Sequence, residues 1–271
     1  MSTEYEIYSG AGNDFVMINN FDGKIKPNEQ KSLTIELCEK NFPKIDGVIF
    51  VDKPSTAQAS LRMNYFNRDG SFGAMCGNGA RCTAMFAKKN NLLTEKKFNL
   101  EAVDKIYSTE ILDDENVTIG FPPDVEMKLN QMIVSGNSEY KFQYVNVGSD
   151  HLVLFVDELE RIDIQSLGSE LRYHKIVMPK GANINFVKVI DQNRIQIRTY
   201  ERGVERETLA CGTGIISSAV VHALINKASS PVKVLVQSGE WLQVDFKISG
   251  SKIEDISLTG SARKISEDVI E

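Results

Sequence analysis

The stretch GAMCGNGARC, residues 73–82, places a cysteine directly before two glycines that flank an asparagine. The stretch TLACGTGIIS, residues 208–217, repeats the Cys-Gly-X-Gly order in the second half of the chain. An aromatic strand end precedes each cysteine, at residues 65–67 and 199–201, and a run of small and apolar residues follows it. One such tetrapeptide can arise by chance, but two in matching surroundings indicate an internal duplication of about half the chain each.

The remainder of the sequence reads as many strands and few helices. Helical periodicity covers residues 28–41, 78–92, 212–227 and, less regularly, 162–174. Short alternating or apolar runs typical of strands fall at 4–9, 15–19, 47–52, 61–67, 97–102, 117–122, 142–148, 152–157, 184–190, 194–201, 232–238, 242–248 and 253–260. This balance predicts an α+β fold in which each cysteine lies at or just before the start of a helix.

A chain of 271 residues is near the length at which one core divides into two. We therefore expect a first domain at 1–121, which carries Cys76, and a second at 122–271, which carries Cys211. The closing segment, about 260–271, could return to the first domain. Residues 120–140 hold two prolines and many polar side chains, so we expect the crossover between the domains there.

Composition and charge exclude several classes of protein. The formal net charge of −6 argues against a nucleic-acid partner, whose binding surface is usually basic. No apolar run approaches the roughly 20 residues needed to cross a bilayer, and the beginning, MSTEYEIYSG, lacks a basic region followed by an apolar one. These features predict a cytoplasmic protein without a membrane partner.

Four cysteines in a chain of this size do not make a disulfide scaffold. Cys38 and Cys82 fall within helical runs and read as small core residues. The three histidines, His151, His174 and His222, are not spaced with another ligand, so we expect no metal site. A functional role is thus left to the cysteines of the two repeated motifs.

The start of a helix favours an anion because it presents unpaired N–H groups and a partial positive charge. A thiol there ionises more easily than a free cysteine, whose pKa is near 8.5. Two such helix starts could hold one amino acid carboxylate between a thiolate that removes the α-proton and a thiol that protonates the opposite face. Such an enzyme is a racemase or epimerase without a cofactor. The alternative is that both motifs are glycine-rich turns with buried cysteines. This interpretation would be preferred for either motif alone, but it explains the matching pair less well.

Several ordered motifs give the chain a family resemblance. They are GAGNDF (10–15), FNRDGS (66–71), CGNGARC (76–82), GANINF (181–186), YERG (200–203), ACGTG (210–214) and LTG (258–260). Together they resemble diaminopimelate epimerase, a cofactor-independent enzyme of lysine and cell-wall precursor synthesis. The resemblance implies two pseudo-symmetric domains, each a curved, mainly antiparallel sheet around a central helix, with the active site in the cleft between them. It also implies a small-molecule substrate, diaminopimelate.

The resemblance further implies a role for each matching residue. Cys76 and Cys211 would exchange the roles of base and acid, while His151 and Glu201 bias their ionisation. The remaining residues implied to bind substrate are Gly77, Asn78, Gly212 and Thr213 at the reacting carboxylate, and Asn13, Asn67, Asn183 and Arg202 at the distal amino acid end, with Glu201 beside them. The residue types suit this work, since arginine can hold a carboxylate by two parallel hydrogen bonds and asparagine can serve an ammonium or a carboxylate.

Two departures from the family pattern bear on substrate and assembly. Where the family usually has Gly-Asn-Pro-His, residues 148–151 read Gly-Ser-Asp-His, so Ser149 replaces an asparagine implied to help bind the distal end. Ser266 stands where some relatives use a tyrosine that helps to form a dimer. The sequence therefore leaves a homodimer as an alternative, but it does not support dimerisation through Ser266.

Four alternatives remain at this point. Proline or hydroxyproline racemase-like enzymes also use two cysteines, but typically read Cys-Gly-His-Gly where this chain has Asn78, and a racemase for another amino acid would tolerate Ser149. A binding protein would not need both thiols. A redox protein that pairs Cys76 with Cys211 would lose activity under reducing conditions, whereas an epimerase would need reducing conditions to be active.

Overall fold

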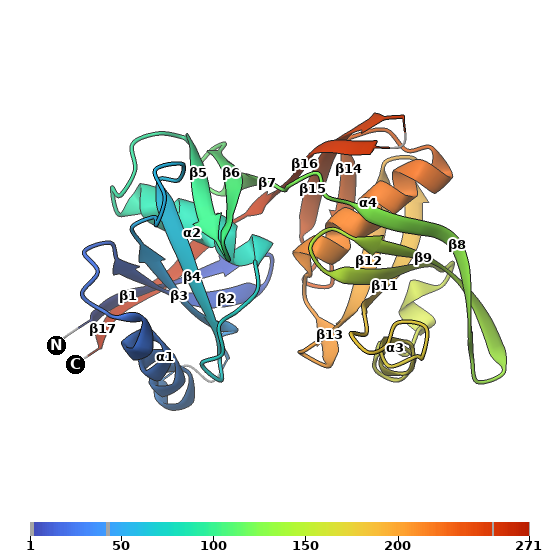
Figure 1. The fold of residues 1–271 in the computed structure, drawn as a ribbon, viewed down its shortest axis with the longest axis horizontal. Coiled ribbons are helices and arrows are strands. Elements are labelled where there is room, and N and C mark those ends of the chain that lie inside the picture. The colour runs from blue at the N-terminus through green and yellow to red at the C-terminus, as the bar shows by residue number, and fades with distance from the viewer. Residues whose placement is uncertain (1–2, 42–43, 251, 271) are drawn as a thin grey trace. The chain divides into compact units, whose positions relative to one another are not determined.

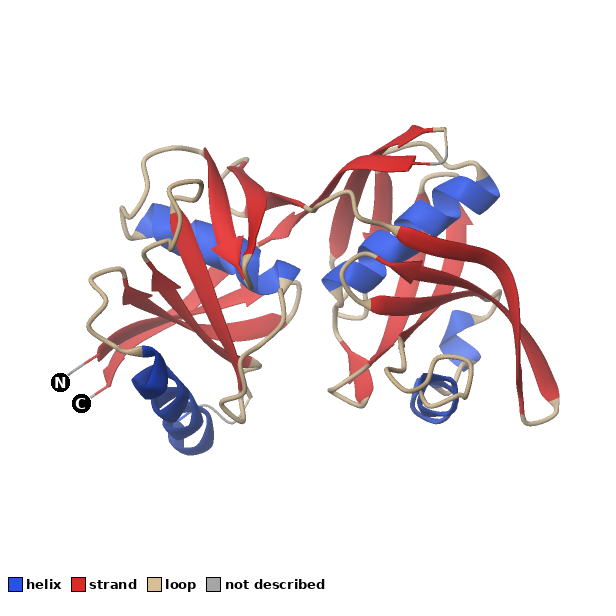
Figure 2. Ribbon diagram, viewed as in Figure 1, coloured by secondary structure: helices blue, strands red, loops and turns tan. Residues whose placement is uncertain are grey.

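The computed structural model describes residues 3–41, 44–250 and 252–270 (Figure 1). The chain forms two compact units, one made of Met1–Gly120 with Thr259–Glu271 and the other of Phe121–Leu258. Each unit combines strands with a few helices (Figure 2). The prediction of a two-domain α+β fold is confirmed.

The first unit contains one mixed sheet and two helices. Its elements are β1 (Thr3–Gly10), β2 (Asn13–Asn20), α1 (Pro27–Glu36) with the π-helical turn η1 (Leu37–Asn41), β3 (Gly47–Asp52), β4 (Leu61–Asn67), α2 (Gly77–Lys89), β5 (Lys97–Ala102), β6 (Lys105–Ile111), β7 (Asn116–Gly120) and β17 (Arg263–Ile270). Antiparallel pairing joins β1 to β2, β3 to β4 and β5 to β6. Parallel pairing joins β2 to β3 and β4 to β5, across α1 and α2 respectively, because a parallel connection needs a crossover.

The second unit repeats this order. Its elements are β8 (Glu126–Ser135), β9 (Ser138–Asn146), β10 (Asp150–Phe155), η2 (Leu159–Arg161), α3 (Ile164–Arg172), β11 (Asn183–Asp191), β12 (Arg194–Glu201), β13 (Arg206–Thr208), α4 (Gly212–Asn226), β14 (Val232–Leu235), β15 (Trp241–Ser249) and β16 (Lys252–Ser261), which continues into the first unit. Antiparallel pairs β9–β10, β11–β12 and β14–β15 alternate with parallel pairs β10–β11 and β12–β14. The predicted duplication is confirmed by this matching series.

One helix in each unit is central to its sheet (Figure 2). Helix α2 contacts β1, β2, β3, β4, β6, β7 and β17, and α4 contacts β9, β10, β11, β12, β14 and β15. A helix surrounded by strands must be apolar on every side, and every residue of α4 from Gly214 to Ala223 is buried. The cysteine motifs thus begin the most enclosed helix of each unit.

The segment expected to hold the crossover contains more regular structure than its composition indicates. The chain passes between units at Gly120 and Phe121, but β8 follows at once and pairs with β9, with a register shift between Lys128 and Gln131. Met132 and Val134 on β8 are more than half exposed. The polar and scattered apolar residues therefore belong to a hairpin with much of its surface in solvent, which hydrophobic alternation alone does not reveal.

Candidate active site

Cys76 is the N-cap of α2. Its Sγ accepts a hydrogen bond from the Gly79 amide at 3.4 Å, and its side chain is half-buried. A Cβ at Gly79 would lie 2.8 Å from Ile49 Cδ1, so glycine allows this turn to approach the sheet closely. The amide bond and the helix start both favour the thiolate form.

Cys211 is the N-cap of α4, with nearly the same backbone conformation as Cys76. It is 8% exposed, and its Sγ lies 3.7 Å from Thr213 Oγ1. Position 214 requires a glycine, because a Cβ there would clash with Asn185 Oδ1. The prediction that both cysteines start helices is confirmed, and the two starts occupy equivalent places in the repeat.

A chain of hydrogen bonds runs from a buried arginine to Asn13 in the first unit. Arg81 is fully buried, donates to Ser261 O and to Asn78 Oδ1, and thereby turns the Asn78 amide group so that Nδ2 donates to Asn13 Oδ1. Because Asn13 Oδ1 is occupied, its Nδ2 group is the one oriented to donate onward. Arg81 therefore fixes the first turn of α2 beside Cys76.

Asn67 belongs to a separate turn of the first unit. Its Nδ2 donates to Ser71 Oγ at 3.0 Å, and its amide donates to Ser71 O. The Asn67 side chain thus bonds within its own turn, to Ser71, whereas Asn13 and Asn78 are joined to the start of α2.

His151, on β10, lies beside the start of α4 in the second unit. Its ring is fully buried, with Nε2 2.8 Å from Thr213 Oγ1 and 2.9 Å from Ser149 Oγ. Burial, and then the positive charge of Arg202, lower the pKa of His151 to about 3. The imidazole is therefore neutral at every pH at which the protein would work.

Asn185 sets the tautomer of that neutral ring. Its Nδ2 donates to Leu152 O, which can only accept, and lies 3.0 Å from His151 Nδ1. Its Oδ1 accepts from Thr199 Oγ1. His151 Nδ1 is consequently the acceptor and Nε2 carries the proton.

The tautomer determines what Thr213 can do. When Nε2–H donates to Thr213 Oγ1, the hydroxyl proton of Thr213 can be directed to Cys211 Sγ or to Ser149 Oγ. A donor directed at sulfur favours the thiolate over the thiol. His151 is thus linked to Cys211 through the Thr213 hydroxyl.

Asn183 and Arg202 meet at the ends of β11 and β12. Asn183 Nδ2 donates to Asp150 O, and its Oδ1 accepts from the Arg202 amide. Arg202 Nη1 donates to Asp150 Oδ2 at 3.1 Å and to Gly181 O at 2.9 Å. Glu201, next along β12, accepts from Thr208 Oγ1 at 2.8 Å.

Sequence patterns did not single out Arg81, Asn185 or Thr199. Arg81 and Asn185 contact the predicted site residues Asn78 and His151, and Thr199 holds Asn185. Arg81 could have been noticed as a charged residue on a helix that is otherwise small and apolar. Asn185 and Thr199 lie directly opposite each other on β11 and β12. Nothing in the sequence gives that register in advance.

Two further features bear on the class of site. Within residues 3–41, 44–250 and 252–270, no three His, Cys, Asp or Glu side chains gather closely enough to hold a metal ion. None of the helices in the described part of the chain is both long and apolar enough to span a membrane.

Known sequences that resemble this chain match it along nearly its whole length. A sequence profile described as diaminopimelate epimerase matches residues 5–122 and 143–265. A diaminopimelate epimerase of Hydrogenobaculum sp. (strain Y04AAS1) is 35% identical over 97% of this chain and 96% of its own. One of Aquifex aeolicus (strain VF5) is 33% identical over 99% of each chain.

Solved structures share the fold at low sequence identity. A PhzF-family phenazine biosynthesis protein of Bacillus anthracis has a TM-score of 0.76 at 16% identity, covering 100% of this chain and 99% of its own. A probable proline racemase of Agrobacterium radiobacter K84 has a TM-score of 0.72 at 14% identity, covering 99% and 93%. At such identities the likeness speaks for the fold alone.

Proposed function

The chain belongs to the diaminopimelate epimerase family, and from this premise we propose that it interconverts LL- and meso-diaminopimelate through Cys76 and Cys211. It is an isomerase that acts on an amino acid. The observation that carries the mechanism is the equivalence of the two thiols: each is the N-cap of the central helix in one copy of a duplicated unit. Two equivalent proton carriers suit a reaction that must run in both directions across one carbon.

In the forward step, one cysteine as thiolate takes the α-proton and becomes a thiol. The electron pair left on Cα delocalises into the adjacent carboxylate, whose charge is stabilised by the N–H groups of the helix starts, at Gly77 and Asn78 or at Gly212 and Thr213. The other cysteine, as thiol, gives its proton to the opposite face and becomes a thiolate. Configuration is inverted, the proton count is unchanged, and the enzyme is ready for the reverse reaction.

The neighbours of each sulfur support this exchange. The Gly79 amide donates to Cys76 Sγ, while neutral His151 holds Thr213 so that its hydroxyl can donate to Cys211 Sγ. Each contact lowers the cost of a thiolate without a permanent positive charge beside it. We assign a similar electrostatic role to Glu201, which lies next to Arg202 on β12.

We assign the distal amino acid end of the substrate to Asn13, Asn67, Asn183 and Arg202. Arg202 presents guanidinium N–H groups to a carboxylate, and Asn13 presents a donor because its Oδ1 already accepts from Asn78. We further propose that the reaction needs no cofactor and takes place in the cytoplasm, where thiols stay reduced. Sedimentation velocity would distinguish a monomer from the homodimer that we leave as an alternative.

The test is exchange of the Cα proton in heavy water with purified protein, followed by mass spectrometry and chiral analysis. Wild type should label and epimerise diaminopimelate, while Cys76→Ala and Cys211→Ala should each lose epimerisation and keep the fold, as judged by circular dichroism. Cys82→Ala, which removes a buried thiol from the same helix as Cys76, is the matched control and should retain activity. Turnover by either site variant, or a preference for proline over diaminopimelate, would overturn the proposal.

A further inference from the structure

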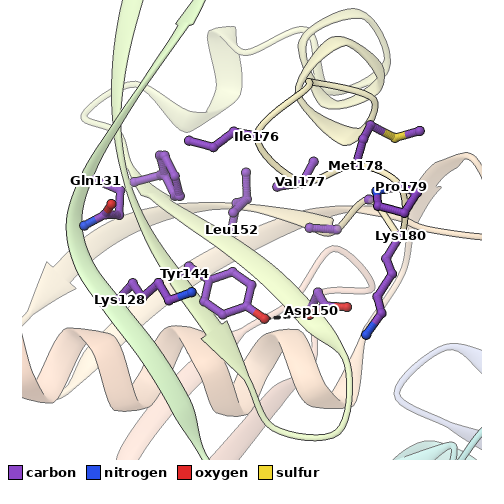
Figure 3. A pocket seen from close by; sticks show the side chains of 13 residues that line it. Lys128, Gln131, Tyr144, Asp150, Leu152, Ile176, Val177, Met178, Pro179 and Lys180 are labelled. Carbon is purple, nitrogen blue, oxygen red and sulfur yellow. Dashed lines mark hydrogen bonds between the residues drawn. The ribbon is translucent and has the colours of Figure 1, made fainter.

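Asp150 is a charged residue on β10 whose carboxylate is surrounded by donors. Oδ1 accepts from Tyr144 Oη at 2.7 Å and from Asn146 Nδ2 at 3.0 Å, and Oδ2 accepts from Arg202 Nη1 at 3.1 Å. Its side chain is only 15% exposed. Figure 3 shows the bond between Tyr144 and Asp150.

The strand places Asp150 on the opposite face from His151. Asp150 pairs directly with Asn146 on β9, and Tyr144 lies opposite Leu152, two residues further along the same face of β10. His151 points instead to the start of α4. The Asp150 carboxylate therefore reaches the site by its hydrogen bond to Arg202.

The charge of Asp150 is secure. Burial alone would raise the pKa of its carboxyl, but the hydrogen bonds from Tyr144, Arg202 and Asn146 outweigh burial and hold that pKa below its usual value. In turn, burial and the Asp150 carboxylate raise the pKa of Tyr144 to about 12, so the phenol remains a donor.

Arg202 is gripped along one side only. Nη1 uses its two protons on Asp150 Oδ2 and Gly181 O. Within the part of the chain that the structure describes, Nε and Nη2 make no hydrogen bond, and the side chain is 28% exposed. The Nε and Nη2 edge is the planar fork that binds a carboxylate by two parallel hydrogen bonds.

We propose that Asp150 is a positioning residue that makes the site selective for a substrate with a second carboxylate. By holding Nη1, it turns the Nε and Nη2 edge of Arg202 toward the distal carboxylate of the substrate. The inference rests on the proposed function. Because Asp150 neutralises Arg202, selectivity comes from the orientation of the fork and not from net positive charge.

The surroundings of Asp150 make it accessible to substitution. A cavity of about 360 Å³ borders it, with Lys128 and Lys180 near the polar end and Leu152, Val177 and Met178 among the apolar residues that line it (Figure 3). A shorter or neutral side chain at position 150 therefore adds to an existing cavity and does not open a new one in a packed core.

The experiment compares Asp150→Ala and Asp150→Asn with wild type, using diaminopimelate and L-lysine, which lacks the distal carboxylate. A misoriented charge-assisted contact costs about one to two decades in affinity. We expect Asp150→Ala to raise KM for diaminopimelate by about tenfold or more with kcat little changed, and to leave lysine exchange unaltered. Asp150→Asn keeps an acceptor for Nη1 and should rescue part of the loss. Tyr144→Phe, which keeps the ion pair, should change KM less than Asp150→Ala.

Calorimetric binding of the diaminopimelate isomer mixture and of lysine, which needs no turnover, separates this inference from the proposed function. If wild type exchanges no Cα proton but binds diaminopimelate more tightly than lysine, and Asp150→Ala loses that preference, the proposed function fails and the inference stands. If turnover occurs but Asp150→Ala keeps the preference, or wild type shows none, the inference is overturned. A lower KM in either variant would also overturn it, because Asp150 would then compete with the substrate.

Discussion

His151 is fully buried, yet both nitrogens of its ring lie within hydrogen-bond distance of polar side chains. Nδ1 accepts from Asn185, which in turn is anchored by Leu152 O and Thr199 Oγ1. The proton on Nε2 is therefore fixed by residues that lie away from the sulfur. Cys211 lies at the end of this chain of hydrogen bonds, next to the Thr213 hydroxyl.

Replacing Asn185 by aspartate tests that chain at nearly constant shape. A carboxylate beside Nδ1 would accept a proton from it, so Nε2 would become the acceptor and draw the Thr213 hydroxyl proton away from Cys211 Sγ. We expect the apparent pKa of the Cys211 thiol to rise and kcat to fall by about 10- to 100-fold. The pH dependence of Cys211 alkylation, resolved by mass spectrometry, measures the first effect.

Asn193→Asp is the matched control, because Asn193 lies in an exposed turn where it bonds to Ser229. It should leave both the alkylation profile and kcat unchanged. An alkylation profile in Asn185→Asp identical to that of wild type would contradict the role given to the tautomer.

Burial of His151 also predicts how stability depends on pH. In the unfolded chain the imidazole takes a proton below about pH 6.5, whereas in the folded protein its pKa is about 3. The unfolded state thus binds more protons in this window, so the stabilising effect of a neutral His151 is complete above pH 6.5 and falls by about 1 kcal/mol per pH unit as the pH drops toward 3.

His151→Gln removes this dependence. Urea unfolding of both proteins between pH 7 and pH 4 should show that the wild type loses more of its free energy of unfolding than the variant. Because both proteins contain the same carboxylates, the difference between them excludes the effect of carboxylate titration. A difference between the two that is constant with pH would show that His151 takes up a proton in the folded state.

At this scale the sequence could predict that the two cysteines begin helices, but not which side chains surround them. Cys76 and Cys211 stand out because glycines follow them, and the need for close backbone approach is a local property. Asn185 is two residues beyond Asn183 in a run that reads only as a buried strand. Its contact with His151 depends on the register of β10 against β11, which is set by the packing of the whole sheet.

Among the elements, α4 shows how closely a helix start can fit its sheet. A Cβ at Gly214 would meet Asn185 Oδ1, and that oxygen cannot swing away without losing its bond to Thr199. We expect Gly214→Ala to lower the free energy of unfolding by about 1 to 3 kcal/mol and to reduce activity, because α4 must shift at its first turn. Urea unfolding and Cα exchange measure the two effects.

Ser217→Ala, one turn further along α4, provides the comparison. Its Oγ is buried and has no hydrogen-bond partner in the described part of the chain, so its removal should leave stability unchanged or raise it. If the two variants lose equal stability, α4 is sensitive to any change, and the close contact between Gly214 and Asn185 would not explain the loss.

The elements themselves were predictable to different degrees. All four helical runs form helices, including the less regular one at 162–174. β8, by contrast, is not predicted, because residues 126–132 alternate only between exposed and half-exposed positions and the strand depends on pairing with β9. A strand whose two faces are both partly solvated has little pattern to read.

For the molecule as a whole, the proposed mechanism requires cysteines from two units to serve one carbon. Two sulfurs that can do so can also form a disulfide when the substrate is absent. We expect mild oxidation to abolish activity, peptide mapping to find Cys76 joined to Cys211, and dithiothreitol to restore turnover. Cys82→Ala should behave as wild type. Unchanged activity and an unchanged free-thiol count after oxidation would contradict the shared site.

The duplication was predictable from sequence because both copies retain the same motif before the same kind of helix. The units differ in how the chain completes them. The second is formed by one continuous segment, Phe121–Leu258, whereas the first needs residues from both ends of the chain. No local pattern in the last strand indicates which unit it joins.

The antiparallel pairing of β1 with β17 joins the first strand to the last. During synthesis on the ribosome, the residues of β1 emerge before those of the second unit and must wait for their partner until residues 263–270 have been made. The second unit can close while translation continues, so maturation of the two halves runs opposite to their order of synthesis. Throughout that interval one edge of β1 is unpaired and open to neighbouring nascent chains, and pairing with β17 removes that edge.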